Sequence, residues 1–109
     1  MRVDRHLLRH ALRGSSVISA NATPDQQARF LAPICEGRHI TTLSLSEAGT
    51  GVHFYLPQTT MEAVSDDAFS LTGNKTFVTN GGKADSYVVS VVAASPEAPI
   101  GQFSCIVVP

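Results

Sequence analysis

The amino-acid sequence changes character once, near residue 40, and this change limits what the chain can fold into. Before it, apolar residues recur at helical spacing. After it, short runs of β-branched and apolar residues are separated by Gly, Pro, Asp and Asn. Helices followed by consecutive strands predict an α+β fold, or two domains of different class that are both incomplete.

An amphipathic helix is expected near the N-terminus. Residues 3–12 place apolar side chains on one side of a helix and arginines on the other. Such an arginine-rich start also resembles an organellar transit peptide, but Asp4 and the lack of an early serine-rich stretch argue against it. The apolar residues 17–20 either continue this helix or begin another.

A second helix has a clear beginning. Thr23 can cap it, Pro24 suits the first helical position, and Gln26 supplies the amide of a capping box. Pro33 is expected to end or reset this helix, and Gly37 suits a C-terminal stop.

Five strands are predicted from residue 40 onward. They are Ile40–Ser46, Gln58–Val64, Phe69–Thr79, Tyr87–Ala93 and Phe103–Val108. The last of them reaches almost to Pro109, so a sheet of about five strands keeps at least one unpaired edge and has a small core. We therefore expect a truncated β-domain.

Composition narrows the classes of function. A chain of 109 residues is long enough for one modest domain. Its net charge of −1 provides no basic field, so nucleic acid is not an expected partner. Cys35 and Cys105 lie far apart in the sequence, which favours reduced thiols in an intracellular protein. No apolar run approaches the roughly 18 to 20 residues that cross a bilayer, so a soluble protein is expected.

Several familiar site patterns fail. The stretch 49–54 lacks the third glycine of a dinucleotide fingerprint, and residues 73–76 lack the spacing of a P-loop. His6 and His10 are one helical turn apart, but no third ligand is spaced nearby, so no metal site is predicted. Glu47 follows an apolar strand and could act as a general base, although a lone carboxylate there is more typical of a turn or cap.

Two stretches remain, LSLSEAGTG at 43–51 and KTFVTNGG at 75–82. In each, a predicted strand alternates apolar residues with a small hydroxyl residue and then breaks into glycines. Backbone N–H groups and a hydroxyl are thereby presented together, and such an array can bind a flat, acceptor-rich ring or a phosphate. The same pattern is also that of two ordinary β-turns, and the residues alone leave both readings open.

Together these stretches resemble the acyl-CoA dehydrogenase family. Its first signature, aromatic-A-L-T-E-P-x-A-G-S-D, is similar to LSLSEAGTGVH, and its second, K-x-[WF]-I-T-N-[GA], is similar to KTFVTNG. TTM resembles the family's T-T-A segment, LTGNK resembles L-N-G-x-K, and ATPDQQARFLAPICEGR resembles the preceding helix. KADSYVVSVVA and FSCIVVP match two later strands, so the resemblance covers residues 17–109 in one unbroken order.

The resemblance implies a domain organisation. N-terminal helices would be followed by a truncated antiparallel β-barrel or sandwich. Residues 1–39 would be the C-terminal part of the helical N-terminal domain and residues 40–109 the middle β-domain, with the C-terminal helical domain absent. In the family that last domain supplies the catalytic carboxylate, so no catalytic residue is expected in this chain, and we expect it to be inactive alone.

The resemblance also implies FAD as the cofactor, accepting a hydride from an acyl-CoA thioester. The residues implied to bind FAD are Leu43, Leu45, Ser46, Gly51, Val52, Phe77, Val78 and Thr79. Phe77 would pack against the flavin with Thr79 beside N5, while Gly51 and Val52 would lie by the pyrophosphate and the acyl-CoA chain. Where the family has Ser-Asp, this chain has Val52 and His53, so a hydroxyl and a carboxylate are lost.

Partners and alternatives follow from the same resemblance. The expected partners are an acyl-CoA substrate, an electron acceptor that the sequence does not specify, and further copies of the full-length protein in a homo-oligomer. The expected location is the cytoplasm, or an organellar matrix in a eukaryote. One alternative is a flavin monooxygenase or nitroalkane oxidase on the same scaffold, favoured by the altered Val52 and His53. Another is a non-catalytic β binding module.

Overall fold

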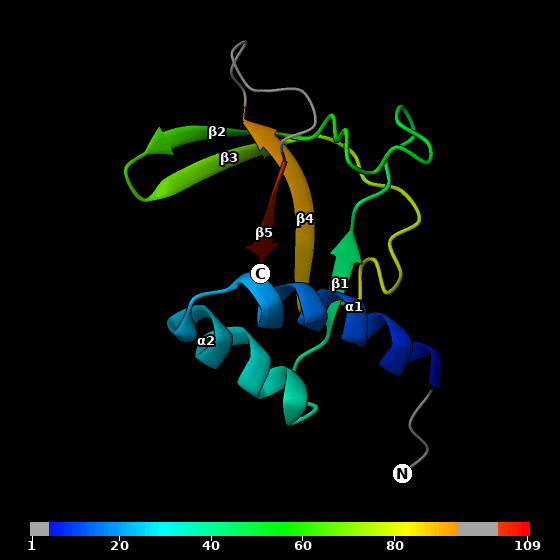
Figure 1. Cartoon of the computed structure of the whole chain (residues 1–109), viewed down its shortest axis with the longest axis vertical. Coiled ribbons are helices and arrows are strands. Elements are labelled where there is room, and N and C mark those ends of the chain that lie inside the picture. Colours follow the sequence, from blue (N-terminus) through cyan, green and yellow to red (C-terminus); the bar gives the residue numbers. More distant parts are fainter. Residues whose placement is uncertain (1–4, 94–102) are drawn as a thin grey trace. The chain divides into compact units, whose positions relative to one another are not determined.

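The computed structural model describes residues 5–93 and 103–109, and the side chains from residue 13 onward (Figure 1). Two helices precede five strands: α1 Arg5–Asn21, α2 Pro24–Cys35, β1 Thr41–Ser44, β2 Thr60–Ser65, β3 Ala68–Thr72, β4 Ser86–Ala93 and β5 Ser104–Val108. This order confirms the predicted α+β class.

The described residues divide into two compact units. Unit 1 comprises residues 5–43, 78–88 and 107–109, and unit 2 comprises residues 44–77, 89–93 and 103–106. Strands β1, β4 and β5 each contribute residues to both units.

Helix α2 of unit 1 begins and ends as elementary capping rules require. Helix α1 continues through residues 17–20, which settles the boundary that the sequence left open. Thr23 and Gln26 form the predicted capping box at the start of α2. At its end, Gly37 takes φ +73°, and two backbone bonds, from Gly37 N to Ile34 O and from Arg38 N to Pro33 O, close a Schellman motif.

Pro33 does not end α2, contrary to expectation. The helix continues to Cys35 with Pro33 inside its last turn. The carbonyl of Pro33 accepts the 3.0 Å bond from Arg38 N in the closing motif. A proline this close to the C-terminus has few helical residues after it to disturb, so the left-handed backbone of Gly37 sets the end of the helix instead.

The sheet is mixed. Its strand order is β1-β4-β2-β3, and β5 pairs with β4. Strands β2 and β3 form an antiparallel hairpin, but β2 pairs with β4 in parallel through Thr60 with Val92 and Met61 with Ala93. A truncated antiparallel barrel or sandwich was expected. Within the described residues the sheet is open, since its path ends at β1 and β3, but it is mixed rather than antiparallel throughout.

Strand β3 is shorter than predicted. It ends at Thr72, whereas a strand was expected to run to Thr79. The residues that follow adopt turns, and Phe77 and Asn80 have φ values of 53° and 60°, which no strand residue can adopt. The β-branched residues of this segment predicted a strand. Composition alone does not indicate that Phe77 and Asn80 adopt the left-handed backbone conformation.

Each unit has a small core of its own. In unit 1, Ile18 and Val88 are buried, and α1 approaches β1 closely at Gly14, where an added Cβ would lie 2.9 Å from Thr41 Cγ2. In unit 2, Val89 and Val91 of β4 are buried. Buried polar side chains outnumber these apolar ones: Thr41, Thr42, Ser44, Glu47, Thr59, Ser86 and Ser90. Hydrogen bonds among such groups therefore hold much of the structure in place.

Candidate functional site

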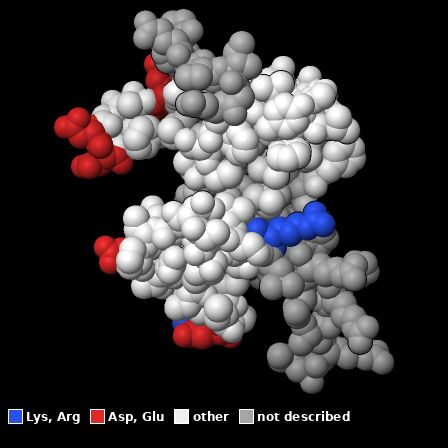
Figure 2. All heavy atoms as spheres, viewed as in Figure 1, with Lys and Arg blue, Asp and Glu red and all other residues white. Residues whose placement is uncertain are grey.

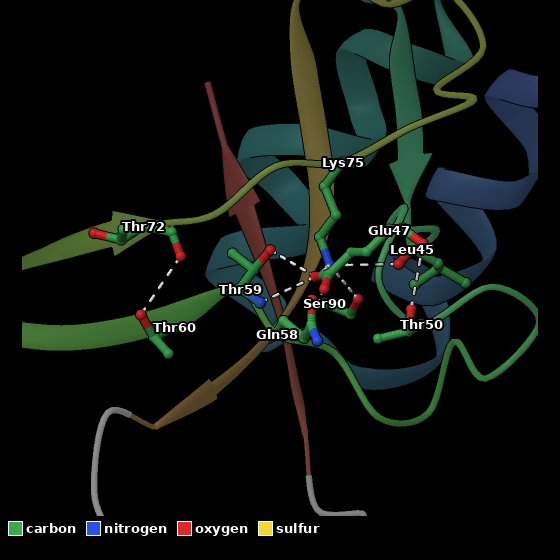
Figure 3. A network of polar contacts seen from close by, with 9 residues as sticks. All are labelled: Leu45, Glu47, Thr50, Gln58, Thr59, Thr60, Thr72, Lys75 and Ser90. Carbon is green, nitrogen blue, oxygen red and sulfur yellow. Dashed lines mark hydrogen bonds and ion pairs between the residues drawn. The ribbon is translucent and has the colours of Figure 1, made fainter.

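A buried ion pair lies at the centre of unit 2 (Figure 3). Lys75 Nζ is 2.6 Å from Glu47 Oε1, and the two side chains are 10% and 3% exposed. Lys75 Nζ also donates to Ser90 Oγ at 2.9 Å and to Leu45 O at 3.4 Å. All three hydrogens of the ammonium thus have acceptors, as a buried lysine requires.

Glu47 is equally well satisfied. Its carboxylate accepts bonds from Gln58 N at 2.6 Å, Thr59 N at 3.0 Å and Thr59 Oγ1 at 2.6 Å, besides the bond from Lys75. Burial raises the pKa of Glu47, but the hydrogen bonds from Lys75, Thr59 and Gln58 outweigh it and lower the pKa to about 2. Glu47 is therefore a weak base that ties three segments together, which agrees with its interpretation as a turn residue.

The parts of the two predicted binding stretches that belong to unit 2, residues 44–51 and 75–77, contact each other. Thr76 N donates to Ser46 O at 2.8 Å, and Lys75 reaches Leu45 O. Phe77 follows directly, with its side chain 95% exposed and its backbone in the left-handed region. Within unit 2, the bonds from Lys75 and Thr76 therefore place the segment that precedes Phe77 beside Leu45 and Ser46, three of the predicted binding residues.

Three further predicted binding residues, Leu43, Val78 and Thr79, belong to unit 1. The buried hydroxyl of Thr42 donates to Thr79 O at 2.6 Å, so β1 also lies beside the second stretch at this point. The chain then turns: Gly81 N donates to Val78 O, and Lys83 N and Ala84 N both donate to Asn80 O. Leu43, Val78 and Thr79 are all half-buried. Among the described residues, Asn80 Nδ2 is buried without a hydrogen-bond partner, which is rare for a buried amide group.

The loop after Glu47 presents a different surface. Gly51 has φ +54°, and a Cβ added there would meet nothing within 4 Å, so its backbone can be approached closely. Val52 is 83% exposed. His53 Nδ1 lies 2.7 Å from Tyr55 Oη, and the two rings pack edge to face. Neither Val52 nor His53 replaces the hydroxyl and carboxylate that the family signature has here.

Sequence reasoning overlooked Thr42 and assigned no role to Lys75. Thr42 belongs to a predicted strand, and nothing in a strand pattern says which hydroxyl will meet a carbonyl 37 residues away. In the sequence, Lys75 stands out only as the first residue of the second stretch. Its pairing with Glu47 could have been suspected, because each of the two stretches that the resemblance sets together contains one charged residue, of opposite sign, and buried charges are paired.

Metal-binding side chains, surface charge and helix length among the described residues bear on which kinds of site the chain can form. Side chains of His6 and His10 lie outside the described part, and the described residues hold no cluster of three or more His, Cys, Asp or Glu that could bind a metal ion. On the face drawn in Figure 2, acidic side chains gather at the upper left, where the β2–β3 hairpin lies, and the other charged side chains are few. Among the described helices, none is long and apolar enough to cross a membrane.

Comparison with known proteins decides the family. The sequence model for the middle domain of acyl-CoA dehydrogenases matches residues 42–109. The chain belongs to the acyl-CoA dehydrogenase family. It is 37% identical over 67 residues to a short-chain-specific acyl-CoA dehydrogenase of Megasphaera elsdenii, covering 62% of this chain and 18% of that protein. It is 32% identical over 92 residues to the mitochondrial isobutyryl-CoA dehydrogenase of Bos taurus, covering 84% of this chain and 21% of that protein.

Solved acyl-CoA dehydrogenase structures share the fold. Butyryl-CoA dehydrogenase from Megasphaera elsdenii superposes with a TM-score of 0.83 at 26% identity, over 94% of this chain and 27% of that one. An acyl-CoA dehydrogenase from Geobacillus kaustophilus gives a TM-score of 0.77 at 30% identity, over 86% and 25%. The chain spans about a fifth of the length of the curated acyl-CoA dehydrogenases that it matches.

Proposed function

We propose that this chain is the FAD-binding portion of an enzyme that dehydrogenates acyl-CoA thioesters between the α and β carbons. When bound, FAD would accept the hydride from the substrate. The observation that carries this proposal is Phe77, whose ring is 95% exposed on a backbone at φ +53°. A bulky residue in the left-handed region costs about 1–2 kcal/mol, and such strain is concentrated at functional sites.

The residues present fit a flavin ring. Phe77 offers an aromatic ring that the described residues leave almost fully exposed. Ser46, with its carbonyl already used by Thr76 N, is held beside the same segment. In unit 1, Val78 and Thr79 are fixed by the Thr42 bond and by the turn at Asn80. By the family resemblance, each unit would contribute its own contacts to the ring: Leu45, Ser46 and Phe77 from unit 2, and Leu43, Val78 and Thr79 from unit 1.

The residues fit the pyrophosphate less well. Gly51 leaves its backbone approachable, which suits a phosphate. Val52, however, offers no hydroxyl, and His53 is engaged by Tyr55. Loss of a hydrogen bond to a charged group costs about 1.5–3 kcal/mol. We therefore expect weaker FAD binding than the family signature would give, and we place the acyl-CoA chain beside Val52.

The state of Glu47 supports the proposal that the 109-residue chain does not turn over substrate by itself. Abstraction of the α proton needs a carboxylate of accessible, ordinary basicity. Glu47 is the carboxylate within the first binding stretch, and it is buried, paired with Lys75 and held at a pKa of about 2. We propose that the base, the subunit contacts of a homo-oligomer and the docking surface for the electron acceptor belong to a longer protein, cytoplasmic or in an organellar matrix.

Titration of the 109-residue chain with FAD tests this function. We expect saturable quenching of flavin fluorescence, and no bleaching of bound flavin when an acyl-CoA is added. Phe77→Ala should weaken binding by about tenfold, as expected for loss of a ring–ring contact of about 1 kcal/mol or slightly more. Phe69→Ala is the matched control, since Phe69 is 60% exposed on β3. Absence of saturable binding would overturn the proposal and favour a non-catalytic binding module.

A further inference from the structure

The hydroxyl of Thr42 makes an unusual contact for a strand residue. Thr42 lies in β1, is 1% exposed, and donates its Oγ1 hydrogen to the backbone carbonyl of Thr79 at 2.6 Å. Both residues belong to unit 1. The donor side of this short bond is buried, and a hydrogen bond is stronger where burial lowers the local dielectric.

This bond acts on a segment that has no strand ladder of its own. The predicted strand ends at Thr72, and the chain around Thr79 is held by turns. Immediately after Thr79, Asn80 adopts φ +60°, and its carbonyl accepts two bonds at 2.9 Å from Lys83 N and Ala84 N. The turn thus fixes the chain on one side of Thr79, and Thr42 fixes the carbonyl of Thr79 itself.

We infer that Thr42 is a positioning residue for the flavin site: through the Thr79 carbonyl it sets the orientation in which Thr79 meets the cofactor. This inference rests on the proposed FAD function, and neither the sequence signatures nor the predicted binding residues include Thr42. A hydrogen-bonding group must be held within a fraction of an ångström to meet its partner, and supporting bonds of this kind provide that precision.

Thr41 supplies a matched comparison on the same strand. It is 0% exposed and its Oγ1 accepts a 3.0 Å bond from Ser86 Oγ, which also lies 2.8 Å from His39 Nε2. The Thr41 side chain is therefore as buried as that of Thr42, and its hydroxyl is hydrogen-bonded to Ser86 instead of to Thr79. Replacing either threonine with valine removes one buried hydroxyl and keeps the side-chain shape.

The test compares Thr42→Val, Thr42→Ser and Thr41→Val in the 109-residue chain. Each variant is measured for thermal unfolding without FAD, for the dissociation constant of FAD by fluorescence quenching, and for the visible absorption band of bound flavin. We expect Thr42→Val to raise the dissociation constant about three- to tenfold, since one hydrogen bond is lost, and to shift the flavin band. Thr42→Ser, which restores the hydroxyl, should bind FAD within about twofold of wild type.

The two valine variants separate positioning from stability. Both are expected to lower the unfolding temperature, but Thr41→Val should leave FAD affinity and the flavin band unchanged. Equal effects of both on FAD binding, or no effect of Thr42→Val, would overturn the positioning role while leaving the FAD function standing. Failure of the wild-type chain to bind FAD would instead overturn the proposed function, and this inference with it.

Discussion

Lys75 and Glu47 form an ion pair inside unit 2, 2.6 Å from Nζ to Oε1, between residues 28 positions apart in the sequence. The pair joins the two stretches that carry the family signatures. It does so without exposing either charge, since both side chains are almost completely buried.

Removing one partner should cost far more than removing both. Lys75→Met leaves the Glu47 carboxylate buried without its counter-ion, and we expect a loss of about 3–5 kcal/mol in the free energy of unfolding. The double variant Glu47→Gln with Lys75→Met should be more stable than the sum of the single effects predicts, because no charge remains buried. Urea unfolding of the four proteins measures both quantities.

A surface pair provides the control for this cycle. Arg38 and Glu36 form an ion pair whose side chains are 65% and 54% exposed. Arg38→Gln should change the unfolding free energy by less than about 1 kcal/mol. A loss of the same size for Arg38→Gln and Lys75→Met would contradict the view that burial gives the Glu47 pair its weight.

Stability should depend on pH through Glu47. Its pKa in the folded protein is about 2, below its ordinary value of 4.5, so the folded state holds its proton less tightly than the unfolded chain does. The stabilisation is therefore fully present above pH 4.5 and is lost as the pH falls from about 4.5 toward 2. Unfolding free energies of wild type and Glu47→Gln, measured across this window, should converge as the pH falls. A constant difference would show that ionisation of Glu47 is not responsible.

Gly73 should tolerate no side chain. A Cβ added there would lie 2.7 Å from Thr59 Cα and 2.3 Å from Thr59 Oγ1, and the Thr59 backbone is held by β2 and by Val92 N. Gly73→Ala should therefore destabilise the chain by about 1–3 kcal/mol. Gly49→Ala is the matched variant: its Cβ would meet only the end of the exposed Gln58 side chain, which can rotate away. Thermal unfolding that ranks Gly49→Ala as the more damaging change would refute this reading.

The capping box should stabilise α2 measurably. Thr23 accepts from Gln26 N at 3.3 Å, and Thr23 N donates to Gln26 Oε1 at 2.9 Å. Thr23→Ala should lower the unfolding free energy by about 1 kcal/mol, and Thr23→Ser should retain most of it. Chemical denaturation distinguishes them, and equal losses for both variants would mean that the hydroxyl does not act as the cap.

Local chemistry determined the elements whose causes are local. The capping box at Thr23, the glycine stop at Gly37 and the β-branched composition of β4 need only neighbouring residues, and the sequence predicted each of them. The ordered series of short motifs likewise indicated the family. The division into domains at residue 40 and the eight flavin contacts stay predictions.

Tertiary structure alone decided what depends on distant groups. The strand predicted to reach Thr79 ends at Thr72, because Phe77 and Asn80 adopt left-handed backbone where the segment meets Ser46 and Thr42. The parallel pairing of β2 with β4 cannot be read from alternation, which is the same for either direction. The burial of Glu47 is equally non-local: its carboxylate is stabilised by donors 11 to 28 residues away, and only folding brings them within bonding distance.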